Sequence, residues 1–597
     1  MKELLSGIEN KIIINPDIFK LPIEFLENKQ EITKEIKMDL ELEYITDCSI
    51  NTNPINLYDY VFNPISKYEQ KIVNKMSYYY TNNKQFINDT QIIIKNIQNI
   101  NSNNIEIFEN IQEDTLLTEI EEILNDTNFL NKYQYIDLPY FHKYNNNSSI
   151  LLLNGINNLI NPVISLIIPI IFMFLPFLII KIQGIPLSIE AYIEHLKNVL
   201  SKHVFGKLIF NFSSANFSNK LYILISFGFY IFQTYTNINY CIKFNKQIKK
   251  IYNQLFNLKI YISNSINKYT QFLNITDKLT TYNLFNLVIK DNIIILNSYL
   301  STLIFINKPN YTYNQIFKLG EIMHRFYQLN NNKQFIETIY YSMYLNGYIN
   351  CLTNLNTNIQ KGDINFCNVN NKDFSQNTII DNYYPTLLDN INKSKKIIKN
   401  TIDLNKNMII TGPNASGKTT IIKSCLFNII LSQQLGCGFY KDANLKIYDF
   451  IYSYINIPDT SARDSLFQAE ARRCKLIIDN IQENSNKNHF CIFDELYSGT
   501  NPDEAIKSGN SLIKYMDKFS TVDFMLTTHF TKLCKQIEKI KNIRVNNYKM
   551  NVKFDNVSND FNYTYRLSPG ISKIKGGKKI LKDLNYPKFI LDSINIK

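Results

Sequence analysis

The strongest constraint on the fold of this chain is an apolar run that opens into a glycine-bounded loop at residues 407–420. The run reads Asn-Met-Ile-Ile-Thr, and a loop bounded by Gly412 and Gly417 follows it. Lys418 and Thr419 come directly after, which completes the G-x-x-x-x-G-K-[ST] spacing of a P-loop. The segment predicts a strand, a phosphate-binding loop and a helix start, and this context disfavours a chance match.

The chemistry of a P-loop accounts for these residue types. Glycines let successive backbone N–H groups point at phosphate oxygens, and the N-terminus of the following helix adds a positive dipole. The hydroxyl of Thr419 can bind Mg²⁺. We therefore expect ATP or GTP together with Mg²⁺. The residues expected to bind the nucleotide are Gly412, Pro413, Asn414, Ala415, Ser416, Gly417, Lys418, Thr419 and Thr420.

A second apolar run, residues 489–493, ends in the two carboxylates Asp494 and Glu495. This is the Walker B arrangement. Asp494 is expected to hold Mg²⁺ together with Thr419, and Glu495 to orient and polarise the attacking water. Two adjacent acids are also common on protein surfaces, but their position downstream of a P-loop favours the catalytic interpretation.

Two further residues are candidates for the same site. His529 follows the apolar run 524–528. A single His is usually structural or exposed, yet at the tip of a neighbouring strand it can contact the γ-phosphate or the water. Ser465 ends a polar loop that begins at Asp459 and enters a helix, whose expected inner face is Phe467, Ala471, Cys474, Ile478 and Ile481.

Length and composition bound the remaining possibilities. A chain of 597 residues is too long for one core, so several structural units are expected. Asn, Ile, Lys, Tyr and Phe are abundant and Trp is absent. These residues have A/T-rich codons, as in an AT-rich genome of a large DNA virus or a protist. The net charge of +12 is therefore weak support for a nucleic-acid or anionic-membrane partner.

The nine cysteines form no C-x-x-C pair and have no His at ligand spacing. They indicate incidental thiols in a reducing compartment. Residues 1–10 are charged and lack the apolar region of a signal peptide, so synthesis in the cytosol is expected.

Pattern changes along the chain predict five parts. Prolines break the polar segment 1–60, which is expected to be a docking segment. Apolar residues at three- and four-residue steps predict helices in 61–150 and longer lever helices in 243–370. The region 151–242 is apolar, and 371–597 has the short apolar runs of an α/β domain.

The apolar region contains two uncharged runs, 151–180 and 221–242. Residues 162–180 of the first run and the whole second run are each close to the roughly 20 residues of a bilayer span. The first run also contains Pro169 and Pro176, which membrane helices tolerate. These features predict a membrane hairpin, with a pair of buried core helices as the alternative. Lysines flank the second run on both sides, so its topology stays open.

Five motifs, in order, resemble the ATPase domain of the MutS mismatch-repair family. They are Thr-Gly-Pro-Asn-x-Ser-Gly-Lys at 411–418, Gln434-Leu-Gly436, Ser465-x-Phe467-x-x-Glu470, Asp494-Glu495-Leu-x-x-Gly499-Thr500 and Thr528-His529-Phe530. The Thr-Gly-Pro-Asn start distinguishes this family from other P-loop proteins. Tyr383-Tyr-Pro385 resembles the start of the family's ATPase domain, and 565–570 with 580–587 resemble the segment that closes it and supports dimerisation.

The resemblance implies a fold class and an assembly. The fold class is an α/β P-loop (ABC-like) ATPase domain at the C-terminus, preceded by a mostly α-helical core and lever region, here with the membrane hairpin. The family acts as a dimer. Each ATP site would then use five residues of its own subunit: Lys418, Thr419, Asp494, Glu495 and His529. Ser465 would approach the γ-phosphate bound to the other subunit. Nucleotide state would open and close the levers.

Departures from the family bear on DNA recognition. About 60 residues before the first helices leave no room for a mismatch-reading domain, and the apolar hairpin stands where a DNA clamp is expected. Ala415 replaces the usual Met, and Tyr497-Ser498 replaces the usual Gly-Arg. The pattern resembles a subgroup of MutS-like proteins with membrane segments, including those of giant viruses.

The expected function is a membrane-associated, MutS-like ATPase homodimer that binds DNA without sequence preference. It would lie on the cytosolic side of a membrane, in a host cell or, if viral, a virion. The first alternative is a soluble mismatch-repair or recombination factor in the cytoplasm or nucleus. The second is a nucleotide-gated scaffold that does not hydrolyse ATP.

Overall fold

The computed structural model describes residues 18–42, 56–100, 113–184, 188–202, 204–306, 313–369, 376–388, 397–455, 457, 465–555, 560–574, 581, 584–587 and 589–590. Much of the predicted docking segment, the loop from Asp459 to Asp464 and most of 580–597 lie outside these residues.

The chain divides into two units, which are described separately. The helical unit comprises Met1–Asn15, Glu106–Asn267 and Asn292–Tyr340. The sheet unit comprises Pro16–Ile105, Lys268–Asp291 and Tyr341–Lys597. The predicted five-part division of the chain stays a prediction.

A six-stranded sheet forms the centre of the sheet unit. In sheet order its strands are β10 (Phe450–Tyr454), β11 (His489–Phe493), β12 (Val522–Thr528), β7 (Asn407–Thr411), β13 (Val545–Asp555) and β14 (Asp560–Pro569). The first five are parallel, and β14 returns antiparallel to β13. Parallel strands cannot be joined by a tight turn, so helices cross over between the parallel strands of this sheet that follow one another in the chain.

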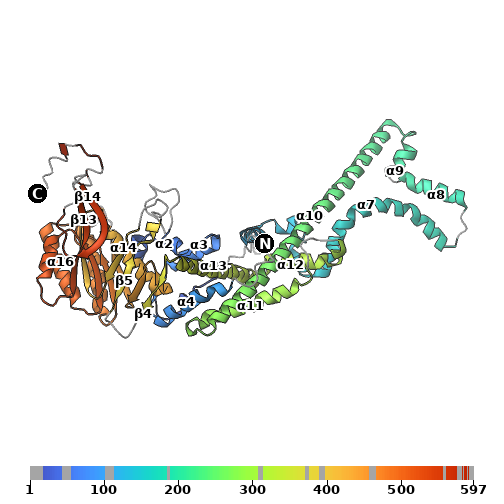
Figure 1. Cartoon of the computed structure of the whole chain (residues 1–597). Coiled ribbons are helices and arrows are strands. Elements are labelled where there is room, and N and C mark those ends of the chain that lie inside the picture. Colours follow the sequence, from blue (N-terminus) through green and yellow to red (C-terminus); the bar gives the residue numbers. More distant parts are fainter. Residues whose placement is uncertain are drawn as a thin grey trace. The chain divides into compact units, whose positions relative to one another are not determined.

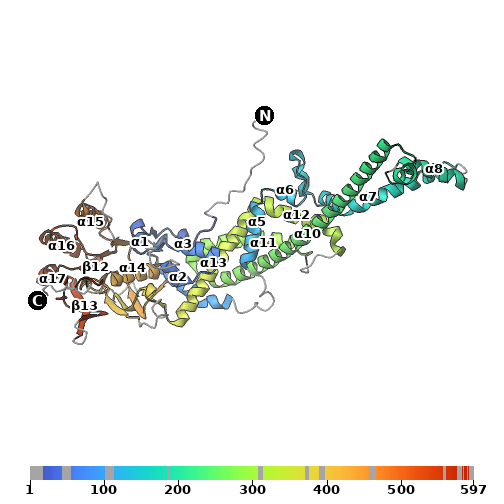
Figure 2. The ribbon, with the colours of Figure 1, turned by 90° about the horizontal axis from the view of Figure 1, so that it is seen from above.

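The inner strands are buried throughout and mostly apolar because helices cover both faces of the sheet. Every residue of β7, β11 and β12 is buried, as expected for parallel strands between two helical layers. The helices are α14 (Lys418–Leu435), α15 (Leu466–Glu483), α16 (Pro502–Asp517) and α17 (Thr531–Glu538). Figure 2 shows α15, α16 and α17 on one side of β12 and α14 on the other.

Smaller elements surround this sheet. The strands of the other sheets are β1 (Lys29–Glu31) with β2 (Tyr79–Thr81), β3 (Asn365–Phe366) with β8 (Cys437–Gly438), and β4 (Asn368–Val369), β9 (Asp442–Leu445), β5 (Thr378–Asn382) and β6 (Asn400–Asp403) in sheet order. The N-terminal helices are α1 (Lys34–Asp39), α2 (Leu57–Phe62), α3 (Lys67–Met76) and α4 (Lys84–Asn96).

The end of α14 is hydrogen-bonded to this N-terminal region. Nε2 of Gln434 donates to the carbonyls of Met76 and Tyr79, both at 2.7 Å, and its Oε1 accepts from the hydroxyl of Tyr58 at 2.9 Å. Nε2 of Gln433 donates to the carbonyl of Thr81 at 3.0 Å. Both glutamines are buried, so these bonds fix the end of the helix that begins at the P-loop.

The helical unit contains long helices, three of which continue in sequence into the sheet unit. Its elements include α5 (Glu113–Asn125), α6 (Phe129–Lys132), α7 (Ser148–Ile182), α8 (Ile189–Lys202), α9 (Val204–Gly206), α10 (Phe217–Thr276), α11 (Asn283–Thr302), α12 (Leu319–Asn331) and α13 (Lys333–Lys361). The segments α8 and α9 lie between the end of α7 and the start of α10 (Figure 1).

Close packing of α7 on α12 requires a glycine in each helix. A Cβ on Gly320 would lie 2.0 Å from the carbonyl oxygen of Ser148, and a Cβ on Gly155 would lie 2.5 Å from Cδ2 of Leu319. The two backbones therefore approach each other more closely than larger residues allow.

The membrane hairpin in the predicted fold class is wrong. No helix in the part of the chain that the structure describes combines the length and the hydropathy of a membrane span. The second run is only the first part of α10, a 60-residue helix, and polar residues such as Gln233, Thr236 and Asn239 recur within it. Apolar side chains on α7 and α10, including Ile171 and Phe229, are nevertheless exposed. The hydropathy pattern alone could not distinguish such helices from a span.

We predict that Gln434→Leu destabilises the chain. The change leaves the Tyr58 hydroxyl and the two carbonyls without their partner, at a cost of about 2 to 4 kcal/mol in the free energy of unfolding. The urea midpoint, followed by circular dichroism, measures this cost. Gln482→Leu, at an exposed glutamine of α15, is the matched control and should leave the midpoint unchanged. An unchanged midpoint for Gln434→Leu would contradict the anchoring role.

Candidate nucleotide-binding site

The P-loop residues lie between β7 and α14, as the spacing predicts. Gly417 has a φ of +93° at the N-terminus of α14, a conformation that side chains with a Cβ rarely adopt. A Cβ on Gly412 would lie 2.8 Å from Oγ of Ser416 and 2.9 Å from Cβ of Met550. Both glycines are therefore required by the loop's own geometry. Oγ of Ser416 donates to the Pro413 carbonyl at 2.7 Å, which closes the loop.

Asp494 follows β11 and Thr419 follows β7, and the two side chains meet at the carboxyl edge of the sheet although β12 lies between these strands. The hydroxyl of Thr419 donates to Oδ2 of Asp494 at 2.8 Å, and the hydroxyl of Thr527 donates to Oδ1. The backbone N–H of Asp494 donates to the carbonyl of Tyr454 at 2.8 Å. The carboxylate is thus held from both oxygens and from the backbone. A hydroxyl beside a carboxylate is an oxygen donor set that suits Mg²⁺, with nucleotide phosphates completing its shell.

A second group of side chains lies beside Asp494 and Thr419 and consists of Glu495, His529 and Lys418. Nε2 of His529 lies 2.8 Å from Oε1 of Glu495 and 3.2 Å from Nζ of Lys418. Nζ of Lys418 is 3.8 Å from the same carboxylate oxygen. One imidazole nitrogen cannot donate to the carboxylate and accept from the ammonium at once, so the tautomer of His529 selects its partner.

The surroundings change the acidity of two of these groups. The hydrogen bond from His529 lowers the pKa of Glu495, burial opposes this, and the positive charge of Lys418 adds to the lowering. Burial lowers the pKa of Lys418, while the carboxylates of Glu495 and Asp494 oppose that shift. Glu495 also has a positive φ of 53°, a left-handed conformation that costs energy for a residue other than glycine.

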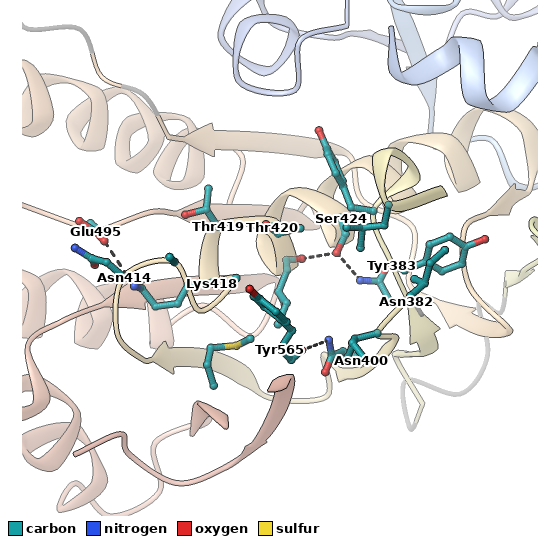
Figure 3. A pocket seen from close by; sticks show the side chains of 18 residues that line it. Asn382, Tyr383, Asn400, Asn414, Lys418, Thr419, Thr420, Ser424, Glu495 and Tyr565 are labelled. Atoms are coloured by element: carbon teal, nitrogen blue, oxygen red, sulfur yellow. Dashed lines mark hydrogen bonds and ion pairs between the residues drawn. The ribbon is translucent and has the colours of Figure 1, made fainter. Parts of the chain in front are cut away.

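A cavity of about 670 Å³ opens beside the loop. Figure 3 shows Glu495, Asn414 and Lys418 toward one end of it and Asn382 and Tyr383 toward the other. Sequence reasoning missed the residues that line the rest of the cavity. They include Asn382, Tyr383, Tyr384, Leu387, Ile397, Ile398, Asn400, Ser424, Met550 and Tyr565.

These missed residues come from separate elements, β5, β6, α14, β13 and β14 and the segments that flank them. Tyr383 and Tyr565 lie in segments that the family resemblance singled out, which was the available signal. The ring of Tyr565 passes close to the P-loop, since a Cβ on Gly417 would lie 3.3 Å from its Cδ1.

Ser465 is not among the residues that line this cavity. It is exposed and caps α15, where its Oγ accepts from the N–H of Gln468 at 3.3 Å and its own N–H donates to that side chain at 2.9 Å. Its predicted action on a partner's nucleotide stays a prediction.

Glu470 connects α15 to the segment after β11. Its buried carboxylate accepts from Oγ of Ser498 at 2.9 Å and from the N–H of Gly499 at 3.2 Å. Gly499 packs under the same helix, since a Cβ there would lie 2.7 Å from Cγ of Leu466. The loop that follows Glu495 is thereby fixed to α15.

A P-loop after one parallel strand and a Walker B pair after another strand of the same sheet are the features of P-loop nucleotide-binding proteins. More particularly, residues 408–596 match the family described as MutS domain V. The C-terminal part of the chain is thus related to the MutS family. The predicted subgroup with membrane segments and the predicted viral source receive no support from the comparisons.

Three relatives illustrate this relationship. "DNA mismatch repair protein MutS" of Persephonella marina is 27% identical over 189 residues, which are 31% of this chain and 21% of the relative. "Endonuclease MutS2" of Clostridium novyi is 27% identical over 202 residues, 33% of this chain and 24% of the relative. "DNA mismatch repair protein MSH3" of Scheffersomyces stipitis is 28% identical over 215 residues, 34% of this chain and 20% of the relative. The match therefore spans less than a quarter of each relative.

We predict that Glu470→Ala loosens the loop after β11. The change removes the acceptor of Ser498 and Gly499, at a cost of about 1 to 3 kcal/mol. Hydrogen exchange of residues 496–501 should accelerate, and the urea midpoint should fall. Glu483→Ala, at the exposed end of the same helix, is the control and should change neither. Unchanged exchange in Glu470→Ala would refute the role of this carboxylate.

Proposed function

We propose that this chain binds and hydrolyses ATP with Mg²⁺, works as a homodimer of the MutS type and acts on DNA. The observation that carries the ATPase proposal is the meeting of two groups at one end of a nucleotide-sized cavity. These groups are Thr419 with Asp494, and Lys418 with Glu495 and His529.

Each side chain has a role that its position supports. Lys418 is only 5% exposed, and its ammonium can pair with phosphate oxygens beside the P-loop amides. Glu495 is the base that orients and polarises the attacking water, and a pKa below its ordinary value keeps it ionised for this task. His529 is a positioning residue, because its hydrogen bond holds the Glu495 carboxylate.

Mg²⁺ would be held by Thr419 and Asp494 together with the phosphates. When bound, it would neutralise the charge that develops on the phosphate oxygens. The hydroxyl of Thr527 keeps the Asp494 carboxylate oriented for this role.

The other end of the cavity suits a nucleobase. Tyr383 and Tyr384 supply aromatic rings, and Leu387 and Ile398 supply apolar surface. A flat heteroaromatic ring stacks well on such side chains. The adenine of ATP is the base proposed, in accordance with the relationship to the MutS family.

The DNA and dimer proposals rest on the relationship of residues 408–596 to MutS domain V. The relatives named above are DNA mismatch repair proteins and an endonuclease, and the matched region is only part of each. Action on DNA is therefore favoured over the membrane function first expected. The location inferred from the sequence stays a prediction.

The decisive experiment measures ATP turnover and nucleotide binding in the same variants. Glu495→Ala should lower kcat by about 10² to 10⁴-fold while ATP binding persists, because only the water-activating base is lost. Lys418→Ala should abolish ATP binding itself. Steady-state phosphate release gives the turnover, and fluorescence of a labelled ATP analogue gives the affinity.

Glu538→Ala, at an exposed glutamate of α17, is the matched control and should behave as wild type. An unmodified chain that binds ATP without turnover would refute the enzyme and favour a scaffold. Full turnover in Glu495→Ala would instead refute the role given to this carboxylate.

The pH dependence of kcat should report the His529–Glu495 contact. The His529 hydrogen bond lowers the pKa of Glu495, so this carboxylate stays charged to a lower pH than an ordinary one. In His529→Ala the remaining burial raises that pKa, and the acid limb of the pH–kcat profile should move to higher pH. A reduced kcat with an unmoved acid limb would show that His529 does not act through Glu495.

A further inference from the structure

All the charged side chains of helix α10 are positive. It carries no Asp or Glu over its 60 residues. Its only charged residues are Lys220, Lys243, Lys246, Lys249, Lys250, Lys259 and Lys268. Four of these lysines lie within eight consecutive residues. Such a segment attracts anions unless acids of neighbouring elements neutralise it.

The helix holds these four lysines on one face. Phe244, Ile248, Ile251 and Tyr252 are at most 1% exposed and bind α10 to the rest of its unit. At 3.6 residues per turn, Lys243, Lys246, Lys249 and Lys250 fall on the opposite side, and all four are exposed. We refer to these four residues as the lysine face.

The surroundings of the lysine face determine whether its charge is already neutralised. Within the described residues, none of the four ammonium groups forms an ion pair or a hydrogen bond. A neighbouring element is α6, because Nε2 of Gln247 donates to the carbonyl of Lys132 at 2.6 Å. Asp126 in that region already pairs with Lys132 at 2.5 Å. Its charge therefore serves a cation outside the lysine face.

We propose that the lysine face binds the phosphate backbone of duplex DNA without sequence preference. From Lys243 to Lys250 the helix rises about 10 Å, and duplex DNA presents one negative charge per roughly 1.7 Å of its axis. Flexible ammonium groups can therefore each reach a phosphate, and they read no base. This proposal rests on the proposed action on DNA and names the surface that performs it.

The test compares four proteins, each as the full chain, in binding to a fluorescent duplex at increasing KCl concentration. The first is wild type. The second replaces the four residues of the lysine face by Gln. The third replaces them by Arg, which keeps the charge. The control removes the same number of charges from exposed lysines of the sheet unit, with Lys514→Gln, Lys535→Gln, Lys539→Gln and Lys541→Gln.

The Gln variant should bind duplex DNA at least about tenfold more weakly than wild type. The slope of log K against log[salt] should become shallower by about 0.9 for each phosphate that a lysine no longer neutralises, up to about 3.6 in all. The Arg variant and the control should bind as wild type does. Unchanged ATP turnover and thermal midpoint would show that each variant is folded.

The outcomes separate this proposal from the proposed function. If the wild-type and Gln proteins bind the duplex with equal affinity and equal salt dependence, the proposal for the lysine face is overturned. DNA would then bind elsewhere on the chain. A wild-type protein that binds no duplex at low salt would overturn the action on DNA itself. Loss of binding in the Gln variant to vesicles containing phosphatidylserine, with duplex binding unchanged, would overturn the proposal in favour of an anionic lipid surface.

Discussion

Thr411, Phe493 and Thr528 end three neighbouring parallel strands, and the pairing between these strands fixes the position of each end relative to the others. Phe493 pairs with Leu526 on β12, and Thr528 pairs with Thr411 on β7. The residues that follow each end must therefore meet at one edge of the sheet, which is where ligands bind in open α/β sheets. A slip of one residue in either pairing would separate Asp494 from Thr419, so the site depends on this register.

Helix α14 holds the C-terminal side of the P-loop in place. This helix begins at Lys418, is buried along nearly all its length and ends at Gln433 and Gln434, whose amides bond to the N-terminal region. Gly436 extends this attachment, since its carbonyl accepts from Nε2 of Gln91 at 2.7 Å. The phosphate-binding helix is therefore supported by Tyr58, Met76, Tyr79, Thr81 and Gln91.

Sequence reasoning found the parts of the site that are contiguous and missed those that only the fold assembles. Spacing identified Lys418, Thr419, Asp494 and Glu495, because a P-loop and a strand ending in two acids are local patterns, and the structure brings these residues together. No local pattern links Tyr384 to Tyr565, which reach the cavity from distant elements. The membrane hairpin failed for a related reason. Hydropathy counts apolar residues along the chain, while their surroundings depend on how α7 and α10 pack.

For lysine too, the position of the residues in the fold is more informative than their number. Codon bias can explain why lysine is abundant, and a charge of +12 spread over 597 residues indicates little about a partner. It does not explain why α10 contains no acid, or why four of its lysines lie opposite the buried Phe244 and Ile248. A random surplus of lysine would place some of those charges beside acids or against the core, where they would be paired or costly to bury. The arrangement, and not the amount, of positive charge points to an anionic partner.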